Sequence, residues 1–138
     1  MRYTILPARI LFASIFILSG FNHFSQQPIA YAAAAGVPLA SLAVPASGIL
    51  ALAGGLSIAL GYHARLGGAA LVAFLVPVTL AMHAFWKVSD PMQHQMQFVM
   101  FMKNVALLGG AFAFASFGAG PLSLDARRPA PQLARAAA

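Results

Sequence analysis

The sequence predicts an all-α membrane protein, a four-transmembrane-helix bundle with both termini in the cytoplasm. Three observations lead to this fold class. Hydrophobic residues make up 61% of the 138 residues, and charged residues make up only 7%. A soluble domain carries about 25% charged residues, so this composition cannot supply a water-facing surface. Four separate stretches are apolar over roughly the length of a bilayer, and the cations gather at the ends of these stretches.

The four predicted spans each approach the roughly 20 predominantly apolar residues that a membrane-crossing helix needs. They cover residues 5–21, 39–62, 66–86 and 96–117. Asn22-His23 closes the first span, and only His63-Ala64-Arg65 separates the second from the third. The spans form one transmembrane domain over residues 1–118. Residues 119–138 are predicted to be a basic, disordered cytoplasmic tail.

The segments between the spans carry turn signals. Gln26-Gln27-Pro28 and Gly36-Val37-Pro38 are typical of turns, and they flank the run Ala32–Ala35, which can form a short interfacial helix. Ser89-Asp90-Pro91 marks the last connection before the fourth span. The spans are therefore joined by short polar connections.

The cations predict the orientation. With four spans, six arginines fall on one side: Arg2, Arg9, Arg65, Arg127, Arg128 and Arg135. Lys87 and Lys103 belong to the other side. The positive-inside rule then places both termini in the cytoplasm, in a bacterial inner membrane. An alternative is a signal peptide cleaved near Ala30-Tyr31-Ala32. It would leave three spans and put the arginine-rich tail outside, against the charge bias.

Composition also excludes several kinds of site. The chain has no cysteine, which rules out dithiol chemistry and thiolate metal sites on it. The histidines lack metal-binding spacing and no span contains an acidic residue, so no metal site is predicted. The formal charge of +6 lies at the ends of apolar runs, where topology and lipid head groups explain it better than nucleic acid. No catalytic triad or phosphate loop is present.

Lys103-Asn104 is a polar pair inside the fourth apolar stretch. An ammonium group in hydrocarbon costs about 2.5–3.5 kcal/mol on insertion scales, so it requires a partner, a wet cavity or a nearby interface. At 1.5 Å per residue, Lys103 lies about 10 Å inward from Met96. The candidate site is therefore a polar pocket open to the outer face. Its predicted residues are Asn22, His23, His83, Lys103 and Asn104.

These residues also have simpler explanations. Lys103 can extend its stem to the outer head groups. His23 can be an ordinary interfacial residue, and His83 and Asn104 can do no more than hydrogen-bond across helix interfaces. The pocket hypothesis offers hydrogen-bond donors to an anion or to a carbonyl such as a quinone oxygen, and a histidine that can exchange a proton.

The order of these motifs resembles the DoxX family of small four-helix membrane proteins. Four segments carry the resemblance: Gly20–Phe24, Gly54–Arg65 with its paired glycines, Phe98–Gly110 with Lys103-Asn104, and Gly118–Asp125. There are two departures. Many relatives have a glutamate about where Ala51 stands, and Gly-Ala-Gly replaces the usual Gly-Pro-Gly.

The resemblance implies association with membrane redox systems. It suggests an accessory or ligand-binding subunit of a quinone-linked redox assembly, with a bound quinone as the one cofactor considered and with other redox subunits or a second copy as partners. A quinone-dependent oxidoreductase acting on a thiosulfate-type anion is the alternative, and a small oligomeric transporter is the third. Whether the chain is itself an enzyme stays open.

Overall fold

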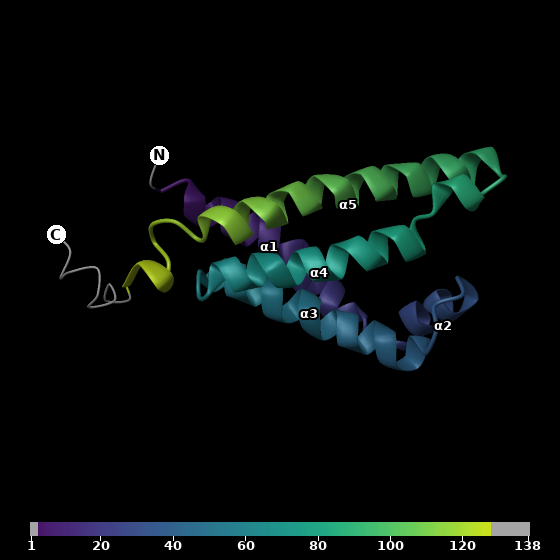
Figure 1. Ribbon diagram of the computed structural model, residues 1–138, viewed down its shortest axis with the longest axis horizontal. Helices are drawn as coiled ribbons and strands as arrows, with labels where there is room; N and C mark the ends of the chain where they lie inside the picture. Colours follow the sequence, from purple (N-terminus) through teal and green to yellow (C-terminus); the bar gives the residue numbers. More distant parts are fainter. Residues whose placement is uncertain (1–2, 128–138) are drawn as a thin grey trace.

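The computed structural model describes residues 3–127. The elements along the chain are α1 (Ile5–Asn22), α2 (Gln26–Ala34), α3 (Ala40–Leu60), α4 (Ala64–Met82), the 3-10 turn η1 (Phe85–Lys87), α5 (Pro91–Phe117) and the 3-10 turn η2 (Asp125–Arg127) (Figure 1). By length and composition, four of these helices can cross a membrane: α1, α3, α4 with its extension to Lys87, and α5. The prediction of an all-α chain with four candidate spans is confirmed.

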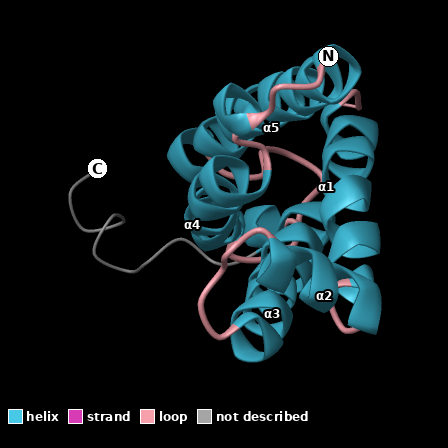
Figure 2. Ribbon diagram, turned by 90° about the vertical axis from the view of Figure 1, so that its right-hand side faces the viewer, coloured by secondary structure: helices cyan, strands magenta, loops and turns pink. Residues whose placement is uncertain are grey.

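The long helices pack in the order α1, α3, α4, α5, and α2 lies on α3 at one end of the bundle. We call this the α2 end and the opposite one the termini end. The view along the bundle shows the four long helices around a shared interior (Figure 2). The largest buried side chains of that core are Phe16, Ile58, Leu71 and Leu75. Apolar packing among these helices therefore holds the bundle together.

Glycines let the helices approach closely. A Cβ on Gly54 would lie 2.9 Å from the carbonyl oxygen of Gly67, and a Cβ on Gly68 would lie 2.7 Å from that of Ala111. Lipid supplies no hydrophobic drive for helix association, so such close contacts carry much of the packing energy.

Two helix boundaries differ from the sequence prediction. α5 begins at Pro91 instead of residue 96, because Asp90 caps it by accepting a 2.8 Å hydrogen bond from the Gln93 amide and proline suits the first helical position. α4 ends at Met82 instead of residue 86, since His83 leaves the helical conformation with φ −123° and ψ 40°. His83 therefore lies at the end of α4 and not within a continuous helix.

The segment after α5 docks on the termini end. Arg9 of α1 is 1% exposed and donates from its terminal nitrogens to the carbonyls of Ala119 at 3.0 Å and Leu122 at 2.8 Å. Asp125 accepts from the backbone amides of His63 at 2.8 Å and Ala64 at 3.0 Å, which caps α4. Residues 119–127 thus differ from the expected disordered tail, because a buried guanidinium and a helix cap hold them. Residues 128–138 lie outside the described residues.

Candidate functional site

A polar cavity of about 210 Å³ lies at the α2 end of the bundle. α1, α4 and α5 form most of its wall, and α2 contributes Tyr31. Four of the five sequence-predicted site residues line it: His23, His83, Lys103 and Asn104. Phe16, Phe74, Leu75 and Leu107 are among its apolar lining. The structure therefore gathers, from three helices, polar side chains that lie far apart in the sequence.

Asn104 is the most enclosed polar residue of the cavity. Its side chain is 6% exposed and makes no hydrogen bond within residues 3–127. In that same range, Arg9 Nε is the sole fully enclosed side-chain nitrogen or oxygen without a partner, so the Asn104 amide keeps access to the cavity that it lines. A ligand in the cavity can therefore form a hydrogen bond with this amide.

Lys103 is adjacent to Asn104 on α5, but its side chain is exposed. Among the described residues its ammonium has one hydrogen-bond contact, to Met100 Sδ at 3.6 Å, and a thioether is a weak acceptor. Lys103 also lines the cavity. The ammonium is therefore a donor with unused capacity at the cavity rim.

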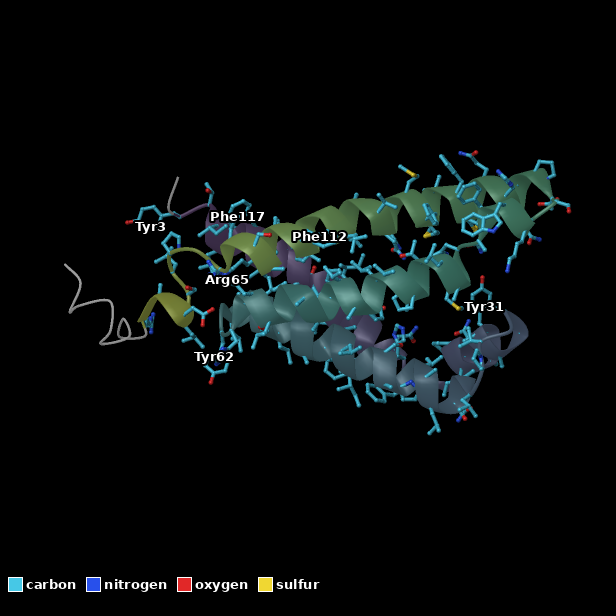
Figure 3. The ribbon with its side chains drawn as sticks, viewed as in Figure 1. Tyr3, Tyr31, Tyr62, Arg65, Phe112 and Phe117 are labelled. Atoms are coloured by element: carbon cyan, nitrogen blue, oxygen red, sulfur yellow. The ribbon has the colours of Figure 1, made fainter. Side chains whose placement is uncertain are left out.

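His83 belongs to a hydrogen-bonded chain that joins three elements. Its Nδ1 lies 2.8 Å from Gln97 Oε1, and Gln97 Nε2 donates to the Tyr31 hydroxyl at 3.1 Å. Because the amide oxygen only accepts, Nδ1 carries the proton and Nε2 is the nitrogen left for a ligand. Figure 3 shows Tyr31 extending from α2 toward the end of α4. This series of hydrogen bonds fixes the tautomer of His83, and the Tyr31 hydroxyl still has its proton to donate.

His23 is held in a similar way at the end of α1. Its Nδ1 donates to the carbonyl of Ser19 at 2.6 Å, and its ring packs edge-on against Phe74 with centroids 5.7 Å apart. The carbonyl can only accept, so Nε2 is again the nitrogen available to a ligand. Both cavity histidines are therefore oriented by a partner on Nδ1.

The structure does not bring Asn22 to the cavity. Asn22 is exposed, accepts a 3.4 Å hydrogen bond from Ser25 Oγ on its side chain, and does not line this cavity. Successive helical residues are rotated by about 100°, so Asn22 and the adjacent His23 point in different directions.

Tyr31 and Gln97 are site residues that the sequence analysis did not assign. Gln97 precedes Asn104 by seven residues, which is about two helical turns, and this spacing was a usable sign that both lie on one face of α5. No comparable sign existed for Tyr31, because its position depends on how α2 folds back over the bundle. Within residues 3–127, no three His, Cys, Asp or Glu residues lie close enough to hold a metal ion.

A sequence model of the DoxX family matches residues 4–84, more than half of the chain. The match contains α1 to α4, including His23, Tyr31 and His83, and it ends before α5. Lys103 and Asn104 therefore lie outside the matched residues. No curated protein and no solved structure matches the chain.

Proposed function

The chain belongs to the DoxX family of multi-pass membrane proteins, and we propose that it is a ligand-binding subunit of a quinone-linked membrane redox assembly. The cavity lined by His23, His83, Lys103 and Asn104 then binds the carbonyl-bearing ring of a quinone. The observation that carries this proposal is the enclosed Asn104 amide, which lines the cavity without a hydrogen bond.

The donors of the cavity suit a quinone carbonyl. A quinone oxygen accepts hydrogen bonds, and Lys103, Asn104 and the Tyr31 hydroxyl each have a proton to donate. The walls contributed by Phe16 and Phe74 suit the faces of a planar ring. Polar groups set into an otherwise apolar pocket are the usual pattern of a small-molecule site.

The size of the cavity limits what it can enclose. At about 210 Å³ it falls below the roughly 300–1,000 Å³ of pockets that enclose a whole drug-sized ligand. A cavity of this volume can enclose a single substituted ring, and the rest of the ligand then lies outside this cavity.

A route from the bilayer lies between α1 and α5. Toward the termini end these helices meet where Phe12 packs on Phe114 with ring centroids 5.1 Å apart. Toward the α2 end the cavity lies between them, with Ile15 and Ser19 on one wall and Lys103 on the other. A membrane-dissolved ligand can approach by this side.

The test compares Asn104→Leu with the matched control Asn22→Leu, whose parent side chain is exposed and does not line the polar cavity. We expect Asn104→Leu to weaken binding of a short-chain quinone analogue about tenfold, since one hydrogen bond of about 1.4 kcal/mol is lost. Stability should change little, because the Asn104 side chain makes no hydrogen bond within the described residues that the substitution would remove. Binding would be measured by isothermal titration of the protein in lipid nanodiscs.

Unchanged affinity in Asn104→Leu, or equal losses in both variants, would contradict the proposal. A wild-type protein that binds no quinone analogue would reject it outright.

A further inference from the structure

A second cavity adjoins the polar one. Its volume is about 280 Å³, and it lies under α2, between α2, α3 and α4. Four residues line both cavities: His23, Tyr31, Val78 and Met82. The two spaces are therefore neighbours that share one wall.

The second cavity offers almost nothing to a polar group. Most of its lining is apolar, with Ala43, Val44 and Ala81 among the residues. Ser47 Oγ donates to the Val44 carbonyl at 2.7 Å, and His23 Nδ1 donates to the Ser19 carbonyl. The polar groups that remain, His23 Nε2 and the Tyr31 hydroxyl, belong to the wall shared with the polar cavity. Apolar cavities of this kind accept apolar groups and exclude water.

Small side chains and a proline account for the space. Ala32, Ala40 and Val44 form the buried cluster where α2 meets α3, and none of them is large. Pro77 lines the cavity from within α4, where it removes a backbone hydrogen bond of that helix. The cavity thus follows from the residue types at this crossing.

We infer that this apolar cavity holds the hydrocarbon chain of the same ligand whose ring occupies the polar cavity. The inference rests on the proposed function and narrows the ligand to a quinone with an isoprenoid or alkyl chain. The quinone ring contacts Lys103 and Asn104. The hydrocarbon chain of the ligand runs past Tyr31 and Val78, which line both cavities. Its first units lie among Ala43, Val44 and Ala81.

The experiment fills the apolar cavity and leaves the polar one intact. Ala81→Leu acts from α4 and Ala43→Leu from α3, and neither parent residue lines the polar cavity. Ala69→Leu is the matched control, because Ala69 is exposed on α4 and lines neither of the two cavities. Each protein in nanodiscs is titrated with one quinone that lacks a side chain and with the same ring carrying a short isoprenoid chain.

We expect the wild type and Ala69→Leu to bind the chain-bearing quinone more tightly than the bare ring. Each cavity-filling variant should lose about tenfold in affinity for the chain-bearing form and bind the bare ring as the wild type does. Equal affinity of the wild type for both quinones, or no effect of either variant, overturns the inference while the proposed function stands. If neither quinone binds the wild type, the proposed function fails and the inference with it.

A labelling measurement covers the case in which a filled variant fails to fold. A chain-bearing quinone with a photoreactive group at the chain terminus is irradiated with the wild-type protein and the peptides are sequenced by mass spectrometry. Labels on Val44, Ala81 or Met82 that excess bare-ring quinone displaces support the inference. Labels confined to the lipid-facing surface of α5 refute it.

Discussion

At the scale of single residues, the site depends on polar groups whose hydrogen-bonding capacity is not used within the protein. Asn104 is enclosed without a hydrogen bond, and the Lys103 ammonium has only a thioether nearby. In His23 and His83, by contrast, Nδ1 is hydrogen-bonded to a partner within the protein, which orients each ring. A structural polar residue would be expected to have its partners within the protein. Under the proposed function, this contrast makes α5 the wall that contacts the ligand.

Lys103→Met should improve membrane insertion and impair binding. Replacing an ammonium group inside a span removes about 2.5–3.5 kcal/mol of insertion cost. The same change removes a donor from the cavity, so quinone binding and co-purification of redox subunits should both fall. The measurements are insertion efficiency in a glycosylation-mapping assay, nanodisc titration and affinity pull-down.

Lys87→Met is the control, because Lys87 is exposed beyond α4 and lines neither of the two cavities. Equal behaviour of the two variants in binding and pull-down would mean that Lys103 only serves to reach the head groups.

Arg9 has the opposite character, since its terminal nitrogens are used within the protein. Arg9→Met should free the segment after α5, because the carbonyls of Ala119 and Leu122 lose their donor. Hydrogen bonds from a charged donor contribute about 1.5–3 kcal/mol each, so losing both should lower stability by about 3–6 kcal/mol. Hydrogen exchange of residues 118–127 should rise, and Lys87→Met, at the opposite end of the bundle, should leave it unchanged. Unaltered exchange in Arg9→Met would show that Asp125 alone holds the segment.

At the scale of helices, α5 differs from the other spans. It begins early because of the Asp90-Pro91 cap, and Asn104 and Ala111 are its two buried residues. It touches α4 closely through Gly68 and meets α1 through the ring of Phe12, which packs on Phe114. At the α2 end, the polar cavity lies between α1 and α5.

Gly68→Ala should loosen the contact between α4 and α5. The new Cβ would stand 2.7 Å from the Ala111 carbonyl oxygen and also meet the Ala115 backbone, neither of which can rotate away. Overpacking of this kind costs about 1–3 kcal/mol. The check is the free energy of unfolding in mixed micelles.

Gly109→Ala is the matched control, because a Cβ at Gly109 meets nothing within 4 Å. It should stabilise the protein slightly, since alanine is the better helix former by about 0.8–1.0 kcal/mol. Similar destabilisation by both substitutions would contradict the packing described for Gly68.

At the scale of the whole molecule, the two ends of the bundle have different chemistry. The termini end carries Arg9, Arg65 and Asp125 around the docked segment, with Arg65 and Phe117 visible there in Figure 3. The α2 end carries His23, His83, Tyr31 and both adjoining cavities. Under the positive-inside rule the termini end faces the cytoplasm, so the ligand site would open toward the outer leaflet.

Cysteine labelling tests this orientation, and the absence of native cysteine makes single substitutions clean. In intact cells, Gln27→Cys on α2 should react with a membrane-impermeant maleimide. Ala126→Cys, in the docked segment, should react only after the membrane is permeabilised. Labelling of Ala126→Cys in intact cells would instead support cleavage near Ala30-Tyr31-Ala32 and a three-span chain.

The sequence predicted much of the fold because the relevant signals are local. Apolar length located the four spans, and family resemblance agreed with the match over residues 4–84. Polar residues in an apolar setting pointed to His23, His83, Lys103 and Asn104, which the cavity does bring together. Boundaries were less accurate, since the Asp90 cap and the break at His83 depend on single side chains and dihedral angles.

By itself, the sequence determined that this chain is a four-span membrane protein of the DoxX family with costly polar groups near one end. Hydropathy and short motifs depend only on residues that are neighbours in the sequence, so they suffice for those conclusions. Only the tertiary structure decided which polar groups share a space. It excluded Asn22, added Tyr31 and Gln97, and placed Arg9 under a segment 110 residues away. These spatial relations depend on the rotation of each helix about its axis and on contacts across the bundle. A pattern of neighbouring residues determines neither of them.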